Sequence, residues 1–267
     1  MNAMSGGFVD TVDDFGRQWE NYTENTGYYA STDALLSLVG PLLTPLDIRG
    51  KTVADVGAGT GRYSRMLHEL GAAEILALEP SSAFEVLKHN TADCPGIRYL
   101  RGTAEEIPSD GFDLVFCIGV LQFIPEPSSA LRAMRRALKP DGRLFLWVYG
   151  HENNQAYLRM VRPLRKVTSK MSHGSLDMMA GMLAVLAGFY GKLCRFIRLP
   201  MSDYMLHYFS KLNFYSRKLV VYDQLNPTYS KYYRKEELKT LLEQSGFSDI
   251  CFYHHLGYSW SLTARRK

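Results

Sequence analysis

Residues 51–62 read KTVADVGAGTGR, a short apolar strand that runs into three glycines at alternate positions. The glycines are Gly57, Gly59 and Gly61, and Asp55 lies two residues before the first of them. Glycine-rich turns after a strand let the backbone approach a nucleotide-like ligand closely. A nicotinamide dinucleotide fingerprint has the spacing GxGxxG, whereas this stretch has GxGxG. A carboxylate beside the loop repels pyrophosphate, so the stretch favours a ligand that carries an ammonium or sulfonium group.

Apolar strand patterns alternate with helical patterns from this stretch onward. The strand-like runs lie at 52–57, 74–80, 97–102, 112–119 and 142–150, and patterns such as GRYSRMLHEL separate them. A helical pattern at 234–246 then precedes strand patterns in FSDICFYHH and GYSWSLTARRK. This order predicts an α/β fold, a Rossmann-like doubly wound sheet of about seven strands. Ligands of such sheets bind at the carboxyl ends of the strands.

The chain divides into four predicted segments. We expect an aromatic and helical segment at 1–50, a ligand-binding core at 51–150, a helical insertion at 151–230 and a completing helix with strands at 231–267. The formal net charge is +4, which is too small by itself to indicate nucleic acid. Residues 159–218 contain eleven basic and two acidic side chains, a balance of +9 that leaves −5 for the rest. The insertion is therefore a basic cap.

Four cysteines, Cys94, Cys117, Cys194 and Cys251, lie far apart without a metal-binding spacing. Together with the absence of a cleavable signal pattern, they predict a reduced, cytoplasmic protein without structural zinc. The most apolar uncharged run spans the 14 residues 178–191, whereas a membrane span needs about 20. We expect no transmembrane helix, while peripheral contact of the basic cap with a membrane stays open.

The segment VADVGAGTGRYS at 53–64 resembles motif I of class I S-adenosylmethionine-dependent methyltransferases of the small-molecule type. In that family an acidic residue at the end of the second strand binds both ribose hydroxyls, and Glu79 stands at this place. GTAEEIP at 102–108 resembles the segment that surrounds adenine, and FDLVFCIGVLQFIP at 112–125 the strand and turn beside the methionine part. The resemblance covers residues 51–150 and extends more weakly to both ends.

The resemblance implies that the chain binds S-adenosylmethionine and releases S-adenosylhomocysteine. Asp55 would orient the loop and help to hold the methionine amino group, directly or through water. Thr103 stands where the family often has aspartate, and Gln122 where many relatives have histidine. Trp19 is either a packing residue or part of an aromatic segment folded over the cofactor. The predicted cofactor contacts are Asp55, Gly57, Ala58, Gly59, Gly61, Glu79, Pro80, Thr103, Ala104, Glu105, Ile118 and Trp19.

Methyl transfer needs the acceptor atom about 3 Å from the methyl carbon, and a hydroxyl acceptor also needs a general base. His151 is the first candidate for this base, followed by His207, His254 and His255. The turn CIGVLQF at 117–123 lacks the Pro-Pro signature of nucleobase-amine methyltransferases, and Cys117 does not follow a proline. We expect a small or lipid-linked acceptor, methylated at oxygen, and no nucleic acid partner.

Several alternatives stay open at this point. The chain could be a nicotinamide-dependent oxidoreductase, or a non-catalytic module whose basic cap holds a membrane or a protein partner. The cap itself could be a lid over the acceptor or a set of helices that merely pack on the sheet. Tyr229, Tyr232 and Tyr233 could line the acceptor site or serve as ordinary packing. The oligomeric state and the identity of the acceptor are not predicted.

Overall fold

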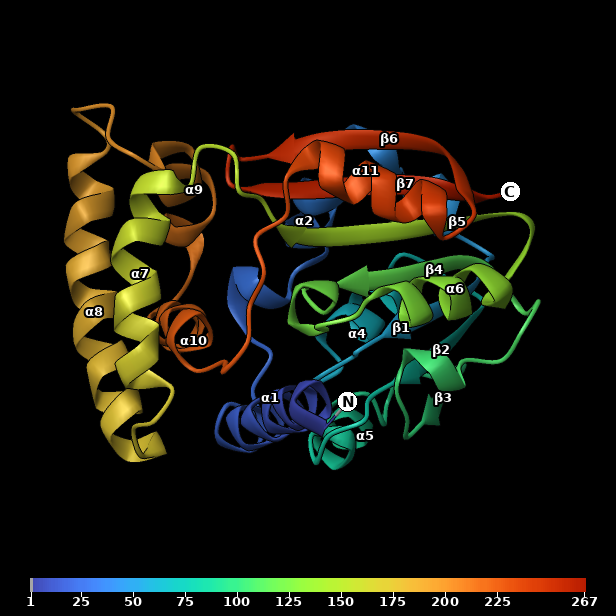
Figure 1. Cartoon of the computed structure of the whole chain (residues 1–267), viewed down its shortest axis with the longest axis horizontal. Helices are drawn as coiled ribbons and strands as arrows, with labels where there is room; N and C mark the ends of the chain where they lie inside the picture. Colours follow the sequence, from blue (N-terminus) through green and yellow to red (C-terminus); the bar gives the residue numbers. More distant parts are fainter. Residues whose placement is uncertain (1) are drawn as a thin grey trace.

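The computed structural model describes residues 2–267 and the side chains of residues 11–267. Its centre is a seven-stranded sheet in the order β3-β2-β1-β4-β5-β7-β6 (Figure 1). The first five strands run parallel, and β7 is antiparallel to both of its neighbours. This confirms the predicted Rossmann-like class. The strands are β1 (Thr52–Val56), β2 (Glu74–Leu78), β3 (Ile97–Leu100), β4 (Phe112–Ile118), β5 (Leu138–Tyr149), β6 (Phe247–His255) and β7 (Ser259–Arg266).

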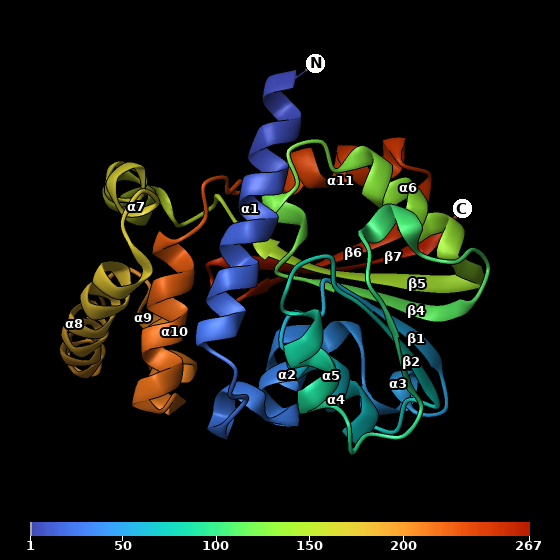
Figure 2. The same ribbon diagram turned by 90° about the horizontal axis from the view of Figure 1, so that it is seen from below.

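Helices cover both faces of the sheet, as Figure 2 shows. On one face lie α2 (Thr32–Val39), α3 (Pro45–Ile48), α4 (Arg62–Glu69) and α5 (Phe84–Asn90). On the other lie α6 (Ser128–Ala137) and α11 (Lys235–Gln244). Each face has its own apolar core, and the central strands, with interior residues such as Val115 and Phe116 fully buried, contribute to both. Strands covered on both sides are apolar throughout, which is why the sequence shows them as continuous runs.

The predicted insertion forms four helices between β5 and α11. They are α7 (Gln155–Thr168), α8 (His173–Leu193), α9 (Ser202–His207) and α10 (Phe214–Leu225). α10 packs against both α7 and α8, and the group lies beyond the end of the sheet, with α7 and α8 outermost (Figure 1). Among the described residues, α8 alone is long and apolar enough to cross a membrane, and 22% of its apolar window is buried. The four segment boundaries given above stay predictions.

The first helix, α1 (Asn2–Asn21), runs between α10 and the sheet (Figure 2). Side chains from distant parts of the sequence hold it there. The Gln18 amide donates to the Asp223 carboxylate at 3.1 Å and accepts from the Asn226 amide at 3.1 Å. Phe15 packs on Phe123, which follows β4, with ring centroids 4.5 Å apart. α1 therefore covers the carboxyl ends of the central strands, where a doubly wound sheet binds its ligand.

α2 ends at Val39, because Gly40 has a φ of +54°, and Pro45 begins α3 after a Thr44 cap. The start of one strand differs from the predicted one. β5 begins at Leu138 rather than at 142. Its first residues pair with Phe112 at an irregularity in the ladder between β4 and β5, which has no signature in the apolar pattern.

Candidate cofactor and acceptor site

A continuous cavity joins the glycine loop to the helices of the insertion. At one end it is lined by the loops that follow β1, β2, β3 and β4, which contribute residues 56–60, 79–81, 102–105 and 118–120. At the other end it is lined by side chains from α9, α10 and the hairpin between β6 and β7. Phe15 and Trp19 of α1 form part of its wall. The cavity thus has a loop end and an insertion end.

The glycine loop has a backbone that only glycine adopts easily. Gly57, Gly59 and Gly61 have φ values of +74°, +56° and +81°. A Cβ on Gly57 would lie 2.4 Å from Val120 Cγ2, and one on Gly59 would lie 3.3 Å from Trp19 Nε1. The N–H groups of Gly57 and Ala58 donate to the Leu78 carbonyl at 2.9 and 2.8 Å, which ties the loop to β2. The loop is therefore closely packed from both sides.

Glu79 presents a fixed carboxylate at the wall of the cavity. Its Oε2 accepts the Gly59 N–H at 2.8 Å, and its Oε1 accepts the Ser81 N–H at 3.0 Å and the Ser81 hydroxyl at 2.5 Å. The residue is 5% exposed and lines the cavity. A carboxylate has about four acceptor positions, so it retains capacity for a ligand hydroxyl.

Asp55 lies beneath the loop and does not line the cavity. Its carboxylate accepts the Ser64 hydroxyl at 2.7 Å, which joins the end of β1 to α4. Burial raises the pKa of Asp55 to about 6, and the nearby Glu79 charge adds to this, while the Ser64 hydrogen bond opposes it. The predicted role of orienting the loop and the predicted contact with a methionine amino group both stay predictions.

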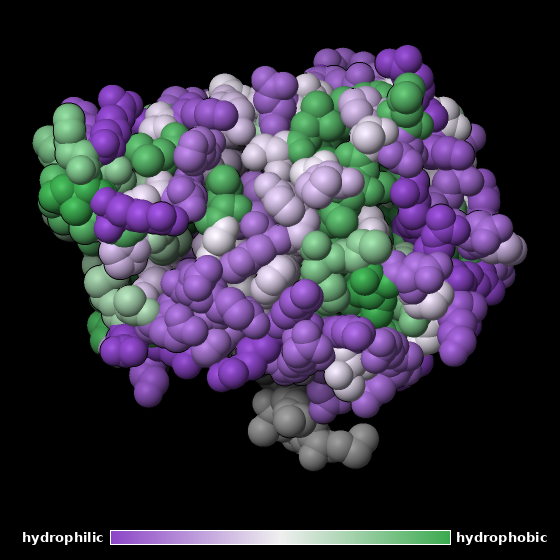
Figure 3. All heavy atoms as spheres, turned by 90° about the horizontal axis from the view of Figure 1, so that it is seen from above, coloured by the Kyte–Doolittle hydropathy of each residue, from purple (hydrophilic) through white to green (hydrophobic). Residues whose placement is uncertain are grey.

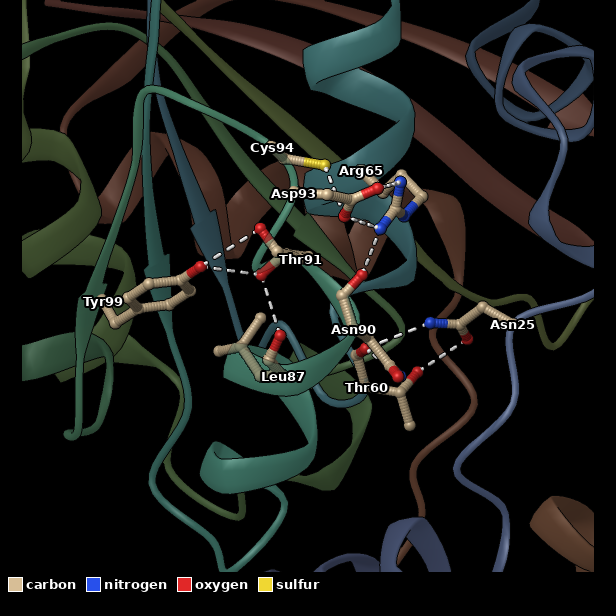
Figure 4. Close-up of polar contacts among 9 residues, drawn as sticks. All are labelled: Asn25, Thr60, Arg65, Leu87, Asn90, Thr91, Asp93, Cys94 and Tyr99. Carbon is tan, nitrogen blue, oxygen red and sulfur yellow. Dashed lines mark hydrogen bonds and ion pairs between the residues drawn. The ribbon is translucent and has the colours of Figure 1, made fainter.

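The outer side of the loop is fastened by a polar network around Thr60 (Figure 4). The Thr60 carbonyl accepts from the amides of Asn25 and Asn90 at 3.0 and 2.9 Å, and its hydroxyl donates to Asn25 at 2.9 Å. Arg65 of α4 bridges the Asn90 carbonyl and the Asp93 carboxylate at the end of α5. The segment after α1, the loop and the two helices are therefore held in one arrangement.

The predicted adenine segment forms a single turn at the edge of the cavity. The Thr103 N–H donates to Glu106 at 2.7 Å, and the Glu105 carboxylate accepts the Ser129 hydroxyl of α6 at 2.8 Å. Thr103, Ala104 and Glu105 all line the cavity. Gln122 is fully buried, and neither atom of its amide has a hydrogen-bond partner among the described residues.

The insertion end of the cavity is lined mainly by aromatic side chains. Four polar groups also line it, and two of them carry opposite charge, Arg62 at the start of α4 and Asp223 of α10. The Arg62 guanidinium lies over the rings of Tyr29 and Tyr63, 3.7 and 4.1 Å from their centroids. The aromatic residues are Tyr29, Tyr63, Trp147, Tyr149, Tyr204, Tyr208 and Tyr258, and the polar ones are Arg62, Asp223, Gln224 and His255.

Asp223 is a half-buried residue whose carboxylate faces this end of the cavity. It accepts the Tyr149 hydroxyl at 2.9 Å and the Gln18 amide at 3.1 Å. Burial raises the pKa of Asp223, while these two hydrogen bonds and the charges of Arg165 and Arg62 oppose the rise. The group is therefore a stronger base than an exposed aspartate.

Of the four candidate histidines, His255 alone lines the cavity. Its Nε2 lies 3.2 Å from the Ser37 hydroxyl, and burial, with a contribution from His254, lowers its pKa to about 4. His151 lines a separate surface pocket with Arg159 and Arg162, so the structure does not bring it to the loop. His207 is exposed, and His254 stacks on Trp260.

The structure gathers most of the predicted cofactor contacts around the loop end. Ten of the twelve line the cavity, the exceptions being Asp55 beneath the loop and Gly61, which caps α4 against Thr91. Tyr232 and Tyr233 are buried outside the cavity wall. Sequence reasoning missed Arg62, Asp223 and the tyrosines, because separate elements supply them. The only local sign was the pair Tyr204 and Tyr208 at helical spacing.

Residues 54–146 match a family model described as a methyltransferase domain. These residues form a class I S-adenosylmethionine-dependent methyltransferase domain. The match ends before the insertion, so the methyltransferase domain contains the loop end of the cavity and little of its aromatic end. The methyl donor of the domain is S-adenosylmethionine.

Curated relatives share this methyltransferase domain. The chain is 31% identical over 135 residues to a ubiquinone biosynthesis O-methyltransferase of Pseudomonas paraeruginosa, covering 49% of this chain and 57% of that protein. It is 34% identical over 112 residues to a tRNA U34 carboxymethyltransferase of Campylobacter hominis, covering 39% of each. The chain thus spans less than two thirds of the length of these relatives.

Solved structures share the fold at low sequence identity. The pyocyanin biosynthetic protein PhzM is similar with a TM-score of 0.54 and 16% identity, over 88% of this chain and 55% of that chain. A SAM-dependent methyltransferase from Thermotoga maritima is similar with a TM-score of 0.51 and 17% identity, over 94% of both chains. Magnesium protoporphyrin IX methyltransferase from Synechocystis, solved with bound S-adenosylhomocysteine, has a TM-score of 0.50 and 16% identity, over 88% and 83%.

The residues of the loop end fit S-adenosylmethionine. The glycines carry no side chain, so a ligand can approach the loop backbone closely, and a Cβ at Gly57 would overlap Val120 of the cavity wall. Glu79 stands fixed at the end of β2, where its free acceptor positions suit a pair of ribose hydroxyls. Phe15 and Trp19 of α1 supply an apolar wall on the opposite side. Glu79, the loop and the segment 103–105 would hold the cofactor.

Proposed function

We propose that the protein is an O-methyltransferase that acts on a small or lipid-like acceptor with a hydroxyl on an aromatic or other unsaturated ring. One observation carries this proposal: the cavity that begins at the glycine loop continues to a half-buried carboxylate, Asp223, within an aromatic wall. The bound cofactor supplies an electrophilic methyl group. The protein must then position a hydroxyl, remove its proton and keep water out.

Asp223 is placed to take the proton of the acceptor hydroxyl. Its raised pKa brings it closer to the range in which general bases work best. The Tyr149 hydroxyl and the Gln18 amide fix the carboxylate from two sides, which orients it before the acceptor binds. Burial and the Asp223 charge raise the pKa of Tyr149, so its hydroxyl stays protonated and donates. Asp223 replaces His151 as our proposed base, because His151 does not line the cavity.

Arg62 and the aromatic wall set the class of acceptor. Arg62 forms no ion pair with a carboxylate within residues 11–267, so its charge is available to an acceptor that becomes anionic as the proton leaves. Aromatic side chains favour flat, apolar rings. Because α1 and α10 close two sides of the cavity, its shape favours a small acceptor over a polynucleotide.

The relatives support an oxygen acceptor without naming it. One group of relatives is described as ubiquinone biosynthesis O-methyltransferases and another as tRNA carboxymethyltransferases. A methyl acceptor of the first kind is smaller and fits an enclosed aromatic space. The loop spacing and these relatives favour methyl transfer over nicotinamide chemistry. The four free cysteines support a cytoplasmic location.

Thermal unfolding tests the cofactor assignment. S-adenosylhomocysteine at about 100 times its dissociation constant should add about 2.7 kcal/mol to the free energy of unfolding, and a nicotinamide dinucleotide should add nothing. Glu79→Ala should lose the effect, whereas Glu69→Ala, an exposed position at the end of α4, should retain it. Stabilisation by the nicotinamide dinucleotide alone would contradict the assignment.

Methyl transfer from labelled S-adenosylmethionine to a panel of phenolic acceptors tests the chemistry. Asp223→Asn should lower kcat by roughly 10²- to 10⁴-fold, the usual contribution of a general base, with unchanged affinity for S-adenosylhomocysteine. In the wild type, kcat should fall as the pH drops through a pKa above the ordinary aspartate value of about 4. Transfer to tRNA but to no small acceptor would remove the proposal while leaving the cofactor assignment intact.

A further inference from the structure

The outermost helices of the insertion, α7 and α8, and the segment directly after α8 expose many large apolar side chains. We call their surface the outer face. Phe196 is 85% exposed and Met160 69% exposed, as much as many charged residues. Figure 3 shows apolar side chains gathered at the end of the molecule formed by these helices, next to hydrophilic ones. The outer face consists of Met160, Val167, Met178, Met182, Val185, Leu186, Phe189, Leu193, Phe196 and Ile197.

α8 is apolar on both of its sides. Its inner side buries Leu176, Ala180 and Ala184, and the helix packs on α10. The exposed residues recur every three or four positions from Met178 to Leu193, which places them on one stripe. A helix at the surface of a globular protein normally turns a polar stripe to water, and one that is apolar all round is covered by protein or by membrane. We therefore expect another molecule, either a protein or a membrane, to cover the outer face.

Seven exposed basic side chains accompany the outer face. None of them forms an ion pair with a carboxylate within residues 11–267. The two acidic residues in the same stretch do not offset them: Asp177 is paired with Lys218 at 2.6 Å, which leaves Asp203. The basic side chains are Arg159, Arg162, Lys166, Lys170, Lys192, Arg195 and Arg198.

We propose that the outer face docks on a membrane surface rich in anionic lipids. The apolar side chains would enter the boundary between headgroups and acyl chains, and the basic side chains would lie at the level of the phosphates. A second copy of this chain would bring seven unpaired cations against seven others, which opposes self-association. The Asp177 carboxylate also accepts the Tyr22 hydroxyl at 2.5 Å, which ties α8 to the segment directly after α1. α8 therefore lies on the membrane and does not cross it.

Docking in this way brings the cavity close to the bilayer. α10 separates the two, because it packs on α8 and contributes Val220 and Asp223 to the cavity wall. The inference does not depend on the proposed acceptor, since it rests on the outer face alone. Membrane binding and methyl transfer can therefore be tested separately.

Vesicle co-sedimentation tests the docking. We expect the protein to bind vesicles of phosphatidylcholine with phosphatidylglycerol and not to bind vesicles of pure phosphatidylcholine. High salt should release it from the anionic vesicles. The triple variant Arg159→Glu, Arg162→Glu, Lys166→Glu should bind at least about 100-fold more weakly, at about fivefold for each basic charge lost. A matched triple variant on α6 and α11, Arg132→Glu, Arg136→Glu, Lys239→Glu, should bind as the wild type does.

A second pair of variants tests the apolar part. Leu186→Ser with Phe189→Ser should lose vesicle binding, whereas Leu46→Ser, at a side chain 75% exposed outside the insertion, should not. Stabilisation by S-adenosylhomocysteine confirms that each variant is folded. Equal binding to neutral and anionic vesicles would overturn the proposal. So would a dimer in solution that binds no vesicle and dissociates in the Leu186→Ser, Phe189→Ser variant.

Discussion

At the scale of single residues, Gly57 and Gly50 share a left-handed backbone but differ in their surroundings. Their φ values are +74° and +72°, yet a Cβ at Gly50 would meet nothing within 4 Å, whereas one at Gly57 would meet Val120 at 2.4 Å. Gly50→Ala should cost about 1–2 kcal/mol of unfolding free energy from the backbone alone and retain binding of S-adenosylhomocysteine. Gly57→Ala should cost more and abolish binding, as measured by urea unfolding and calorimetry. Equal effects of both changes would contradict a cofactor role for the loop.

Asp55 gives the protein a defined pH dependence. Its folded pKa of about 6 lies above the ordinary value of 3.8 because of burial. The folded state therefore binds the proton more tightly than the unfolded state, and this stability is present below pH 3.8 and lost as the pH rises through 6. Asp55→Asn keeps the shape and an acceptor for Ser64 but carries no charge. We expect it to be more stable than the wild type at pH 8, by at most about 3 kcal/mol.

The difference between Asp55→Asn and the wild type should shrink as the pH falls from 8 to 4. Urea unfolding across this range measures it, and subtraction of the two curves removes the contribution of other titrating groups. A constant difference at every pH would show that Asp55 is not the buried charge we describe.

Single residues also mark the limit of what the sequence predicts about the site. The contacts at the loop end could be predicted because each stands at a fixed offset from a strand that the apolar pattern reveals, as Glu79 does. Asp223 could not, because its burial depends on α1 and on Tyr149, which are far away in the sequence. His151 follows β5 directly, which favours it as a base, but it lines a separate surface pocket and not the cavity.

At the scale of elements, the segment after α1 is held to the glycine loop by Asn25, which makes two hydrogen bonds to Thr60. Asn25→Ala removes both at once. At about 0.5–1.5 kcal/mol for each bond, we expect roughly tenfold weaker binding of S-adenosylhomocysteine in calorimetry, because the loop and its cover become less fixed. The matched change Asn21→Ala removes a bond within α1 alone and should leave the affinity unchanged. Unequal melting temperatures without a change in affinity would contradict this coupling.

The bounds of an element can be predicted where it is a strand covered on both faces, and they cannot be predicted for the helices of the insertion. β1, β2 and β4 appear as apolar runs because the sheet is covered on both faces, and their observed bounds agree with the predicted runs to within two residues. The sequence predicts a helical insertion but not the bounds of its helices, because α8 is apolar on both of its sides and shows no clear periodicity. The closure of the cavity by α1 could be predicted only as one of two alternatives for Trp19, because the contacts that hold α1, such as Gln18 with Asp223, join distant parts of the sequence.

At the scale of the whole molecule, cofactor binding should slow amide exchange in elements that are far apart in the sequence. Hydrogen–deuterium exchange should slow in residues 57–61 and in α1 when S-adenosylhomocysteine binds, because Phe15 and Trp19 form part of the cavity wall. α11 should show no change, because it contributes no residue to the cavity wall. Protection of α11 to the same extent as α1 would indicate general tightening rather than a cover over the site.

The placement of α1 has a consequence for how the chain folds. Its anchor residue Gln18 and its partner Asp223 are 205 residues apart in the sequence. Contacts of such separation close large loops and form late, because the entropy of closure must be offset by structure already in place. The sheet can assemble from neighbouring strand–helix units before α10 has folded, and until then α1 has no partner to pack on. A chain interrupted before α10 would therefore hold a folded glycine loop beneath an open site, and α1 would dock only after α10 had formed.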